Sequence, residues 1–437
     1  MSRALARRIQ HDVGDALAAW EHEHRETTGR APSDDQVRVR ASAFIAASVE
    51  QANRRRIETG DSPLVADTVD ELEERVESLL FSLGDLDRYL NDPFIENIFA
   101  NGCDRVFFTT ADGQRHVGAP IADSDDELVD LIRRLASRSG RTERRFDDAQ
   151  PVLNLRLADG SRLFAVMQVS ERPSLSIRRH RYPKVNLDDL VRLGTIDETL
   201  SAVLAAAVSR PRPLNVVVCG GTDTGKTTML RALINEIEPW ERFVVIEDSL
   251  ELHLAADPAA HPNVVELETR EPNVEGAGEI SMRDLARNAL RMAPDRVIVG
   301  EVRGGEVVEM LLAMSQGNDG SMCTLHADSS QSALSKIATY ALMARERLPI
   351  DATNMLIANS VHLIVHLTKI ADGRRVVSSV REITGAEGNL VLSNEVFRPD
   401  EHGVARFAHP FTDTTTRRLV AGGFDPEILH AAAGWRR

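Results

Sequence analysis

The sequence predicts an α/β protein whose C-terminal half is built on a mostly parallel sheet. From about residue 191 onward, short apolar runs alternate with amphipathic helical patterns, as in parallel sheets that are covered on both faces. From about 64 to 190, helix and strand patterns mix, which indicates a smaller α/β domain. Residues 1 to about 60 are rich in Ala, Arg and Glu, and indicate helices with one solvated face.

Within the smaller domain, four patterns predict particular elements. A short helix is expected to open at Asn91–Pro93, since proline suits a first helical turn. The apolar run 106–110 predicts a strand, and the apolar spacing over 128–135 predicts a helix. Residues 153–157 and 162–169 predict a hairpin across a short Asp-Gly turn.

The C-terminal region carries the parallel-sheet pattern, and its last 40 residues show turn signals and a weak helix without a clear place. A break over Glu58–Pro63, with Gly, Pro and short polar residues, separates the helical segment from the smaller α/β domain. We therefore expect domains at 1–63, 64–190 and 191–437. Strands are expected at 214–219, 243–247, 296–300, 321–325, 361–367 and 376–383.

Composition limits the class of protein. The chain has 437 residues, too many for one ordinary core, and its 42% hydrophobic and 27% charged residues are typical of a globular protein. The formal net charge of −15 gives no general attraction for nucleic acid, so direct nucleic-acid binding is not expected.

The sequence also indicates a compartment. Three distant cysteines without a Cys-x-x-Cys pair argue against a disulfide framework or a zinc ribbon, and fit a reducing cytoplasm. The N-terminus lacks the apolar core of a signal peptide, and no run of about 18 apolar residues predicts a membrane-spanning helix. We expect a cytoplasmic protein whose membrane role, if it has one, is peripheral.

A glycine-rich loop supplies the strongest chemical signal. The buried-strand pattern 214–219 leads into Gly220-x-x-x-x-Gly225-Lys226-Thr227, and a helix pattern comes next. This is the strand–loop–helix context in which backbone N–H groups surround phosphates. Lys226 is expected to reach the β- and γ-phosphates of a nucleotide, and Thr227 to ligate Mg²⁺. The residues expected around the phosphates are Gly220, Gly221, Thr222, Asp223, Thr224, Gly225, Lys226, Thr227 and Thr228.

Acidic residues follow two further strand patterns. Glu247 and Glu251 come at and after the end of 243–247, and Glu301 ends the apolar run that begins at Arg296. Ligands of open α/β sheets bind at this edge, where a carboxylate can hold Mg²⁺ through water or polarise an attacking water. A single acid at such a place is more often a helix cap or solvated, but three beside a phosphate loop favour a catalytic role. His326 ends another strand pattern and is expected near the γ-phosphate for the same reason.

In this order, the segments resemble the type II/type IV secretion superfamily of hexameric ATPases, in which a phosphate loop precedes an Asp box, an atypical Walker B strand and a His box. The corresponding segments are Gly220–Thr228, Ile246–Leu252, Arg296–Glu301 and Gly320–Ala327. The run Pro294–Gly304 and Thr324–Ala327 are the most specific of these matches.

The smaller domain resembles the same superfamily and is most like its tight-adherence (Flp pilus, CpaF-type) branch. The resemblance extends over about 65 to 385, and Asn318 departs from it, because the branch often has histidine there. The segments that carry it in this domain are Asp92–Ile98, Asn101–Gly102, Ala158–Arg162 and Ser174–Arg178.

The resemblance implies a RecA-like motor domain after a PAS-like domain, a homo-hexamer, and polytopic inner-membrane platform proteins as partners. It implies ATP with Mg²⁺ held by Thr227 and Glu301, and water activated by Glu301 with Glu251 or Glu247. It further implies that His326 senses the γ-phosphate and that Arg141 and Arg162 extend towards the phosphates. The protein would then power a Flp-type pilus or protein secretion from the inner face of the cytoplasmic membrane.

Two other functions remain open. A conjugation or DNA-transfer motor would share the chemistry, although the negative charge disfavours direct DNA handling. A nucleotide-gated, non-catalytic scaffold is disfavoured by intact Lys226, Glu301 and His326.

Overall fold

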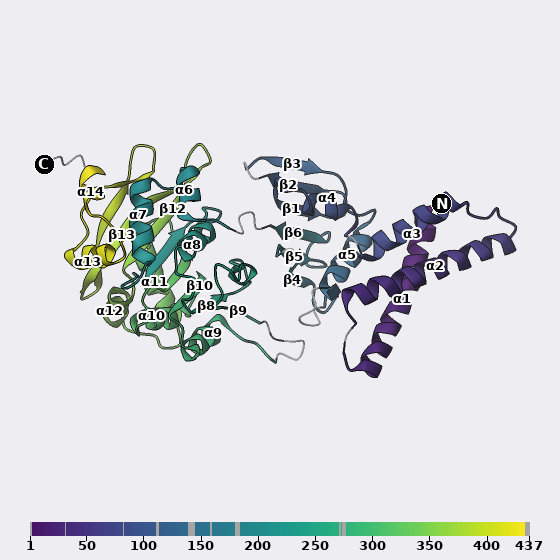
Figure 1. Cartoon of the computed structure of the whole chain (residues 1–437), viewed down its shortest axis with the longest axis horizontal. Helices are drawn as coiled ribbons and strands as arrows, with labels where there is room; N and C mark the ends of the chain where they lie inside the picture. Colours follow the sequence, from purple (N-terminus) through teal and green to yellow (C-terminus); the bar gives the residue numbers. More distant parts are fainter. Residues whose placement is uncertain are drawn as a thin grey trace. The chain divides into compact units, whose positions relative to one another are not determined.

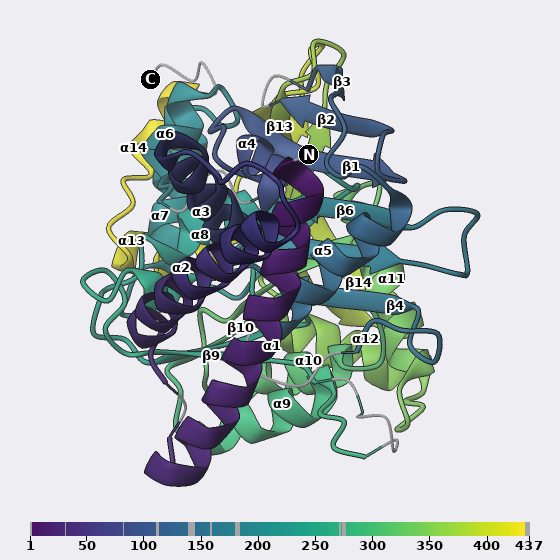
Figure 2. The ribbon, with the colours of Figure 1, turned by 90° about the vertical axis from the view of Figure 1, so that its right-hand side faces the viewer.

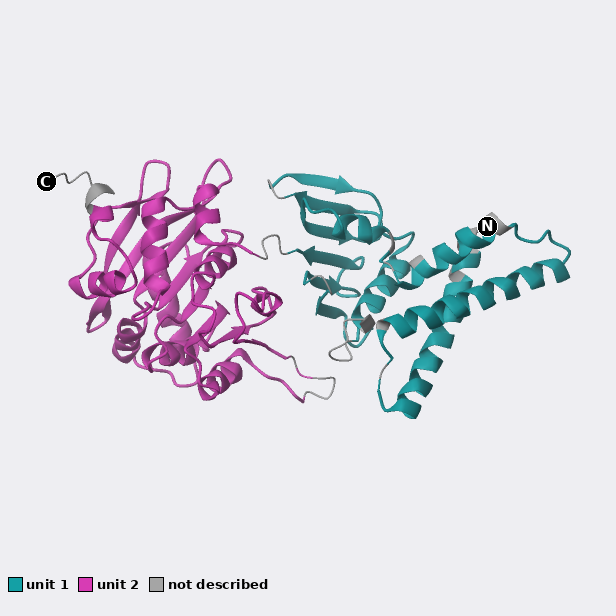
Figure 3. Ribbon diagram, viewed as in Figure 1, with its two compact units in different colours: residues 1–181 teal, residues 182–437 magenta. Residues whose placement is uncertain are grey.

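The computed structural model describes residues 2–30, 32–81, 83–110, 113–138, 145–157, 160–179, 184–270, 272 and 277–432. The chain divides into two compact units, residues 1–181 and 182–437, which Figure 3 colours separately. Each unit is described by itself. The predicted division at 63 and 190 stays a prediction.

Unit 1 begins with three helices, α1 (Ser2–Thr28), α2 (Asp34–Glu58) and α3 (Ala66–Phe81). α1 packs across α2 and α3 (Figures 1 and 2). Their apolar residues recur every three or four positions and form one aliphatic core, while the other faces are polar. The predicted helices with one solvated face are therefore confirmed. The core residues are Ala6, Ile9, Val13, Leu17, Ala41, Ile45, Val49, Ala52, Leu72 and Val76.

The rest of unit 1 is a six-stranded antiparallel sheet with strand order β3-β2-β1-β6-β5-β4. Helix α5 (Asp125–Arg138) packs its apolar side on one face of this sheet. The strand at 106–110, the helix over 128–135 and the hairpin are confirmed. The strands are β1 (Ile95–Asn101), β2 (Val106–Thr110), β3 (Arg115–Gly118), β4 (Val152–Arg156), β5 (Arg162–Val166) and β6 (Ser174–Arg178).

The helix predicted to open at Asn91–Pro93 is wrong. The 3₁₀ turn η1 (Gly84–Leu86) and helix α4 (Asp87–Leu90) come earlier, and β1 starts at Ile95. The Asp92 carboxylate accepts the N–H of Phe94 at 2.9 Å, which is a side-chain turn and not a helix cap. A proline after an aspartate suits both structures, so the local pattern could not separate them.

Unit 2 is built on a nine-stranded sheet of order β15-β14-β13-β12-β7-β11-β10-β8-β9. The six strands from β12 to β9 pair in parallel, and β13, β14 and β15 extend the sheet antiparallel. The strands are β7 (Val216–Gly220), β8 (Phe243–Glu247), β9 (Val264–Glu268), β10 (Arg296–Val302), β11 (Met322–His326), β12 (Leu363–Lys369), β13 (Arg375–Glu387), β14 (Leu390–Pro399) and β15 (Ala405–Phe407).

Helices cover both faces of this sheet, as predicted (Figure 1). Along β7, Val216 and Val218 belong to one core and Val217 and Cys219 to the other, because successive side chains of a strand point to opposite faces. The first core includes α6 (Leu187–Arg192), α7 (Glu198–Val208), α8 (Lys226–Ile234), α13 (Asp413–Ala421) and α14 (Glu427–Ala432). The second includes α9 (Met282–Ala289), α10 (Val307–Ser315), α11 (Ser330–Met343) and α12 (Ile350–Ser360).

Two short 3₁₀ turns, η2 (Leu254–Ala256) and η3 (Leu290–Met292), complete the elements of unit 2. The tail that the sequence left unplaced supplies β15, α13 and α14. Among the described helices, none has both the length and the apolar character that crossing a bilayer requires.

Candidate nucleotide-binding site

The phosphate loop lies at the carboxyl edge of the parallel sheet, between the ends of two neighbouring strands. β7 is fully buried between β11 and β12, and its last residue, Gly220, pairs with His326 and with Leu367. A Cβ on Gly220 would lie 2.4 Å from the carbonyl oxygen of Leu367, so only glycine fits there. Gly225, with φ of 92°, caps α8 in the left-handed region that glycine favours. The predicted strand, loop and helix are thus all present.

Lys226 is enclosed by its own loop. Its side chain is buried, and Nζ donates to the carbonyl oxygen of Gly221 at 2.7 Å. Thr224 donates to the same carbonyl at 2.9 Å. The ammonium therefore lies inside the curve of the loop, close to the first turn of α8, where a phosphate is favoured by backbone N–H groups and by the helix dipole.

His326 connects Lys226 with Glu301. Its Nδ1 lies 3.3 Å from Lys226 Nζ, and its Nε2 lies 3.0 Å from Glu301 Oε1. Because the ammonium can only donate, Nδ1 accepts and the Nε2–H donates to the carboxylate, which is the neutral tautomer. Burial, and then the charge of Lys226, lower the pKa of His326, while Glu301 opposes this shift. The imidazole is therefore neutral at pH 7.

Glu301 is also held from its other side. Arg303 donates to both carboxylate oxygens, at 3.0 and 3.1 Å, and to Asp248 at 3.3 Å. Such a two-pronged contact fixes the plane of the carboxylate. The ends of β7, β11 and β10, which are adjacent in the sheet, thus bring Lys226, His326 and Glu301 together.

The two other predicted carboxylates have different surroundings. Glu251 lies beside the loop, where its Oε2 accepts from the Thr227 hydroxyl at 3.4 Å. Glu247 is buried and accepts the backbone N–H groups of Glu251 at 3.1 Å and Leu252 at 3.3 Å. Burial raises the pKa of Glu247 to about 8. Glu247 therefore shapes the turn that carries Glu251.

The residues around the loop fit a magnesium nucleotide. The Thr227 hydroxyl and the Glu251 and Glu301 carboxylates offer oxygen ligands, which Mg²⁺ prefers, together with water and phosphate oxygens. Lys226 and the loop backbone supply the positive charge that a polyphosphate needs.

The predicted arginines belong to unit 1. Arg141 lies outside the described residues. Arg162 lies on β5, where it pairs across the sheet with Arg156 on one side and with Arg178 on the other. Phe164, two residues further along β5, is 47% exposed, so this face of the sheet carries a row of arginines beside an exposed aromatic ring. α5 packs against the opposite face.

The sequence interpretation missed three basic residues of unit 2. Arg375 of β13 donates to the Asp223 carboxylate at 2.6 Å and to its carbonyl at 3.0 Å, which ties β13 to the phosphate loop. Arg231 on α8 donates to the carbonyl of Glu251. Arg303 could have been found, since it stands two residues after Glu301, but no local signal links Arg375 to a loop about 150 positions away.

The fold and the site define a P-loop protein of the α/β class. A family model described as "Type II/IV secretion system protein" matches residues 82–396, which is more than half of the chain. The chain belongs to this family, as the resemblance implied at the level of the superfamily.

Two relatives in sequence support the same assignment, and a solved structure is reported beside them. The chain is 34% identical over 319 residues to a Mycobacterium tuberculosis protein whose name assigns it to conjugal transfer, with 71% of this chain and 87% of that protein covered. It is 31% identical over 335 residues to the type IV secretion system protein PtlH of Bordetella pertussis, with 70% and 95% covered. Among solved structures, the VirB11 ATPase of the Brucella suis type IV secretion system is 27% identical, with 68% and 91% covered and a TM-score of 0.36.

Proposed function

We propose that this protein is a Mg²⁺-dependent ATPase motor that powers the assembly or retraction of a Flp (tight-adherence) type pilus, or protein secretion across the cytoplasmic membrane. The observation that carries the ATPase activity is the contact series Lys226–His326–Glu301 at three adjacent strand ends. Phosphoryl transfer needs positioning and charge neutralisation more than covalent help, and these residues supply both.

In this proposal, Lys226 and the loop N–H groups bind the phosphates, and Thr227 and Glu301 hold Mg²⁺. Bound Mg²⁺ would neutralise charge on the phosphate oxygens. Glu301 orients and polarises the attacking water, with Glu251 as the partner carboxylate at the Thr227 hydroxyl. Because neutral His326 accepts from Lys226 and donates to Glu301, a γ-phosphate that draws Lys226 away changes the hydrogen bond to Glu301 as well.

Membership of the family also supports a proposal about quaternary structure and location. We propose a homo-hexamer that works with polytopic membrane platform proteins at the inner face of the cytoplasmic membrane. Arg141 and Arg162 of unit 1 would supply positive charge to the transferred phosphate, for which an arginine can be worth about 10³–10⁵ in rate. Light scattering after size exclusion, with and without ATP, tests the ring, and a fully active monomer would refute it.

Glu301→Gln tests the catalytic centre. Glutamine keeps the shape but neither the charge nor the basicity, so ATP binding should persist while turnover falls by about 10²-fold or more. A fluorescent ATP analogue measures binding and phosphate release measures turnover. Glu401→Gln, at a largely exposed position, is the control. Unchanged turnover in Glu301→Gln would remove this residue from the mechanism, and Lys226→Ala should lose binding itself.

The arginine assignment has its own test. Arg162→Ala and Arg141→Ala should each lower the rate of hydrolysis strongly. Arg115→Ala is the matched control, because Arg115 pairs with Thr109 in the same cross-strand row as Arg162 but lies on the edge strand β3. Normal hydrolysis by both variants would refute the assignment.

The name of the M. tuberculosis relative favours a second candidate, a motor for conjugation or DNA transfer. The chemistry would be the same, and the substrate would differ. Neighbouring genes for a small pilin and two polytopic membrane proteins would support the pilus motor, whereas a relaxase or coupling protein would support DNA transfer. A chain that binds ATP without hydrolysing it would instead be a nucleotide-gated scaffold.

A further inference from the structure

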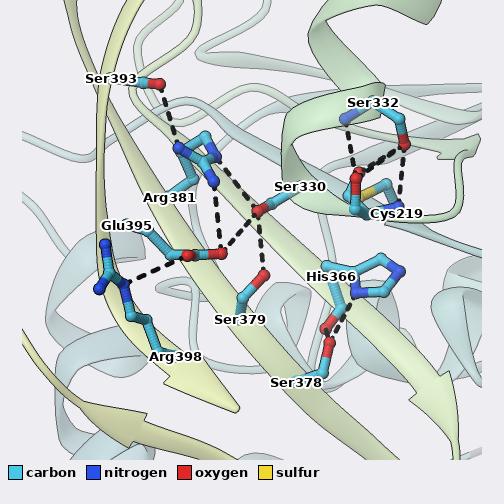
Figure 4. A network of polar contacts seen from close by, with 11 residues as sticks. Cys219, Ser330, Ser332, His366, Ser378, Ser379, Arg381, Ser393, Glu395 and Arg398 are labelled. Carbon is cyan, nitrogen blue, oxygen red and sulfur yellow. Dashed lines mark hydrogen bonds and ion pairs between the residues drawn. The ribbon is translucent and has the colours of Figure 1, made fainter.

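A polar cluster surrounds Ser330 at the start of α11 (Figure 4). His326 is the last residue of β11, and α11 begins at Ser330, so three residues connect them. The Ser330 hydroxyl belongs to a residue that is 1% exposed, yet it contacts three polar side chains. It accepts from Ser379 at 2.9 Å and from Arg381 Nε at 3.2 Å, and donates to Glu395 at 3.4 Å.

Arg381, on the antiparallel strand β13, connects this cluster with the neighbouring strand β14 and with Ser330. Each end of its guanidinium has a different partner: Nε donates to Ser330, Nη1 to Ser393 at 3.2 Å, and Nη2 lies 3.3 Å from Glu395. Its side chain is only 12% exposed. A planar fork that is held in three directions defines the position of each partner, which a lysine cannot do.

The residues that connect β11 to α11 are held at further points. The carbonyl of Ser329 lies 3.8 Å from the thiol of Cys219 on β7, and the Ser329 side chain caps α11 through Ser332. The backbone of Ala327 hydrogen-bonds His366 of β12, whose Nδ1 lies 2.6 Å from the Ser378 hydroxyl. The connection that follows His326 is thus anchored to the parallel strands β7 and β12 and to its own helix.

Burying this many polar groups is costly unless each is satisfied, and a pair of apolar side chains would stabilise a sheet at least as well. Directional hydrogen bonds, unlike apolar packing, fix the position of the Ser330 hydroxyl, which lies four positions after His326. β13 reaches the phosphate loop independently, through Arg375 and Asp223.

We propose that Arg381 and Ser330 form a polar seat for the His326 segment, and that Arg381 is a positioning residue that acts on hydrolysis through His326. This inference rests on the proposed ATPase function. In this proposal, the antiparallel strands β13 and β14, which carry Arg381 and Glu395, help to position the histidine that senses the nucleotide.

The test uses Arg381→Met in the full chain, with Arg398→Met as the matched control. Arg398 pairs with the same Glu395 at 3.3 Å but from an exposed position, 54% accessible. Arg381→Met should lower kcat roughly tenfold, within the range that misplaced groups cause, and leave KM unchanged. Arg398→Met should match the wild type. Arg381→Lys should behave like Arg381→Met.

A double-mutant cycle separates positioning from general damage. If Arg381 acts through His326, then Arg381→Met should cause no further loss of kcat in a His326→Ala background. An equal loss in both backgrounds overturns the proposal. Ser330→Ala is the second variant should Arg381→Met fail to fold, and it should show the same pattern.

Hydrogen exchange tests the seat without relying on hydrolysis. Peptides that cover 326–332 should exchange faster in Arg381→Met than in Arg398→Met, while peptides of α8 remain protected. Unchanged exchange at 326–332 overturns the proposal. A wild type that hydrolyses no ATP would refute the proposed function, and the exchange result would still decide whether the seat exists.

Discussion

Replacing Glu247 with glutamine should make unit 2 increasingly stable relative to the wild type as the pH rises. Glu247 is 3% exposed, and its carboxyl accepts the N–H groups of Glu251 and Leu252. Burial raises its pKa from 4.5 to about 8. Glutamine keeps the shape and an acceptor oxygen but does not ionise.

The sign follows from proton linkage. The folded state holds the Glu247 proton more tightly than the unfolded state does, so this contribution to stability is fully present below pH 4.5 and is lost as the pH rises through about 8. Each unit of difference in pKa is worth about 1.4 kcal/mol, which sets an upper limit of about 5 kcal/mol. We expect the free energy of unfolding of the variant, relative to that of the wild type, to rise by on the order of 2–5 kcal/mol from pH 5 to pH 9.

Unfolding of unit 2 can be followed through its own cysteines. Cys219 and Cys323 are fully buried on β7 and β11, and burial raises the pKa of the Cys219 thiol to about 12, so both react slowly while unit 2 is folded. In a Cys103→Ser background, samples are equilibrated in urea at each pH and then receive a short pulse of a thiol-reactive label at one fixed pH. The labelled fraction of Cys219 and Cys323 reports how much of unit 2 is unfolded. Glu268→Gln, at the end of the neighbouring strand β9, is the control. A stability difference that does not change with pH would refute the reasoning.

Three further predictions concern the same unit. Glu241→Gln should lower the free energy of unfolding of unit 2 by about 3–5 kcal/mol in urea titrations, because fully buried Arg296 pairs with both oxygens of Glu241 at 2.8 Å. A loss below about 1 kcal/mol, which is typical of an ion pair at the surface, would contradict this prediction. Gly220→Ala should weaken binding of a fluorescent ATP analogue and lower the melting temperature, whereas Gly221→Ala, whose Cβ would meet nothing closer than 3.7 Å, should leave the melting temperature unchanged; equal melting temperatures would rule out the clash. The rate of hydrolysis should fall as the pH drops below 6.5, the ordinary pKa of histidine, because the pKa of His326 is lowered and protonation of Nδ1 removes the acceptor for Lys226. The pH–rate profile of His326→Gln should lack this fall in rate. If the variant still shows the fall, another group causes it.

The local elements of the site could be predicted because their signals are contiguous. The strand, the glycine loop and the helix that starts at Lys226 follow one another within about 20 residues, and each has its own pattern. The strands predicted at 243–247, 296–300 and 321–325 correspond to β8, β10 and β11 for the same reason, since a buried parallel strand is a short unbroken apolar run. Strands β9, β14 and β15 were missed because their residues are largely half-buried or exposed and form no unbroken apolar run.

The arrangement of the residues within the site needed the tertiary structure. The carboxylates at 247 and 251 look alike in sequence, but one is buried beneath a turn and the other contacts Thr227. Burial decides this difference, and burial depends on which strands become neighbours. The order β7-β11-β10 brings Lys226, His326 and Glu301 into contact although Lys226 and Glu301 stand far apart in the chain.

The sequence by itself determined that a phosphate loop opens a parallel α/β domain and that acids and a histidine end its strands, because these features are local. Only the tertiary structure decided that His326 bridges Lys226 and Glu301, that Arg375 and Arg381 of the antiparallel extension support the loop and the His326 segment, and that Glu247 is buried. Strand order and side-chain burial depend on contacts between distant segments, and no short pattern in the chain encodes them.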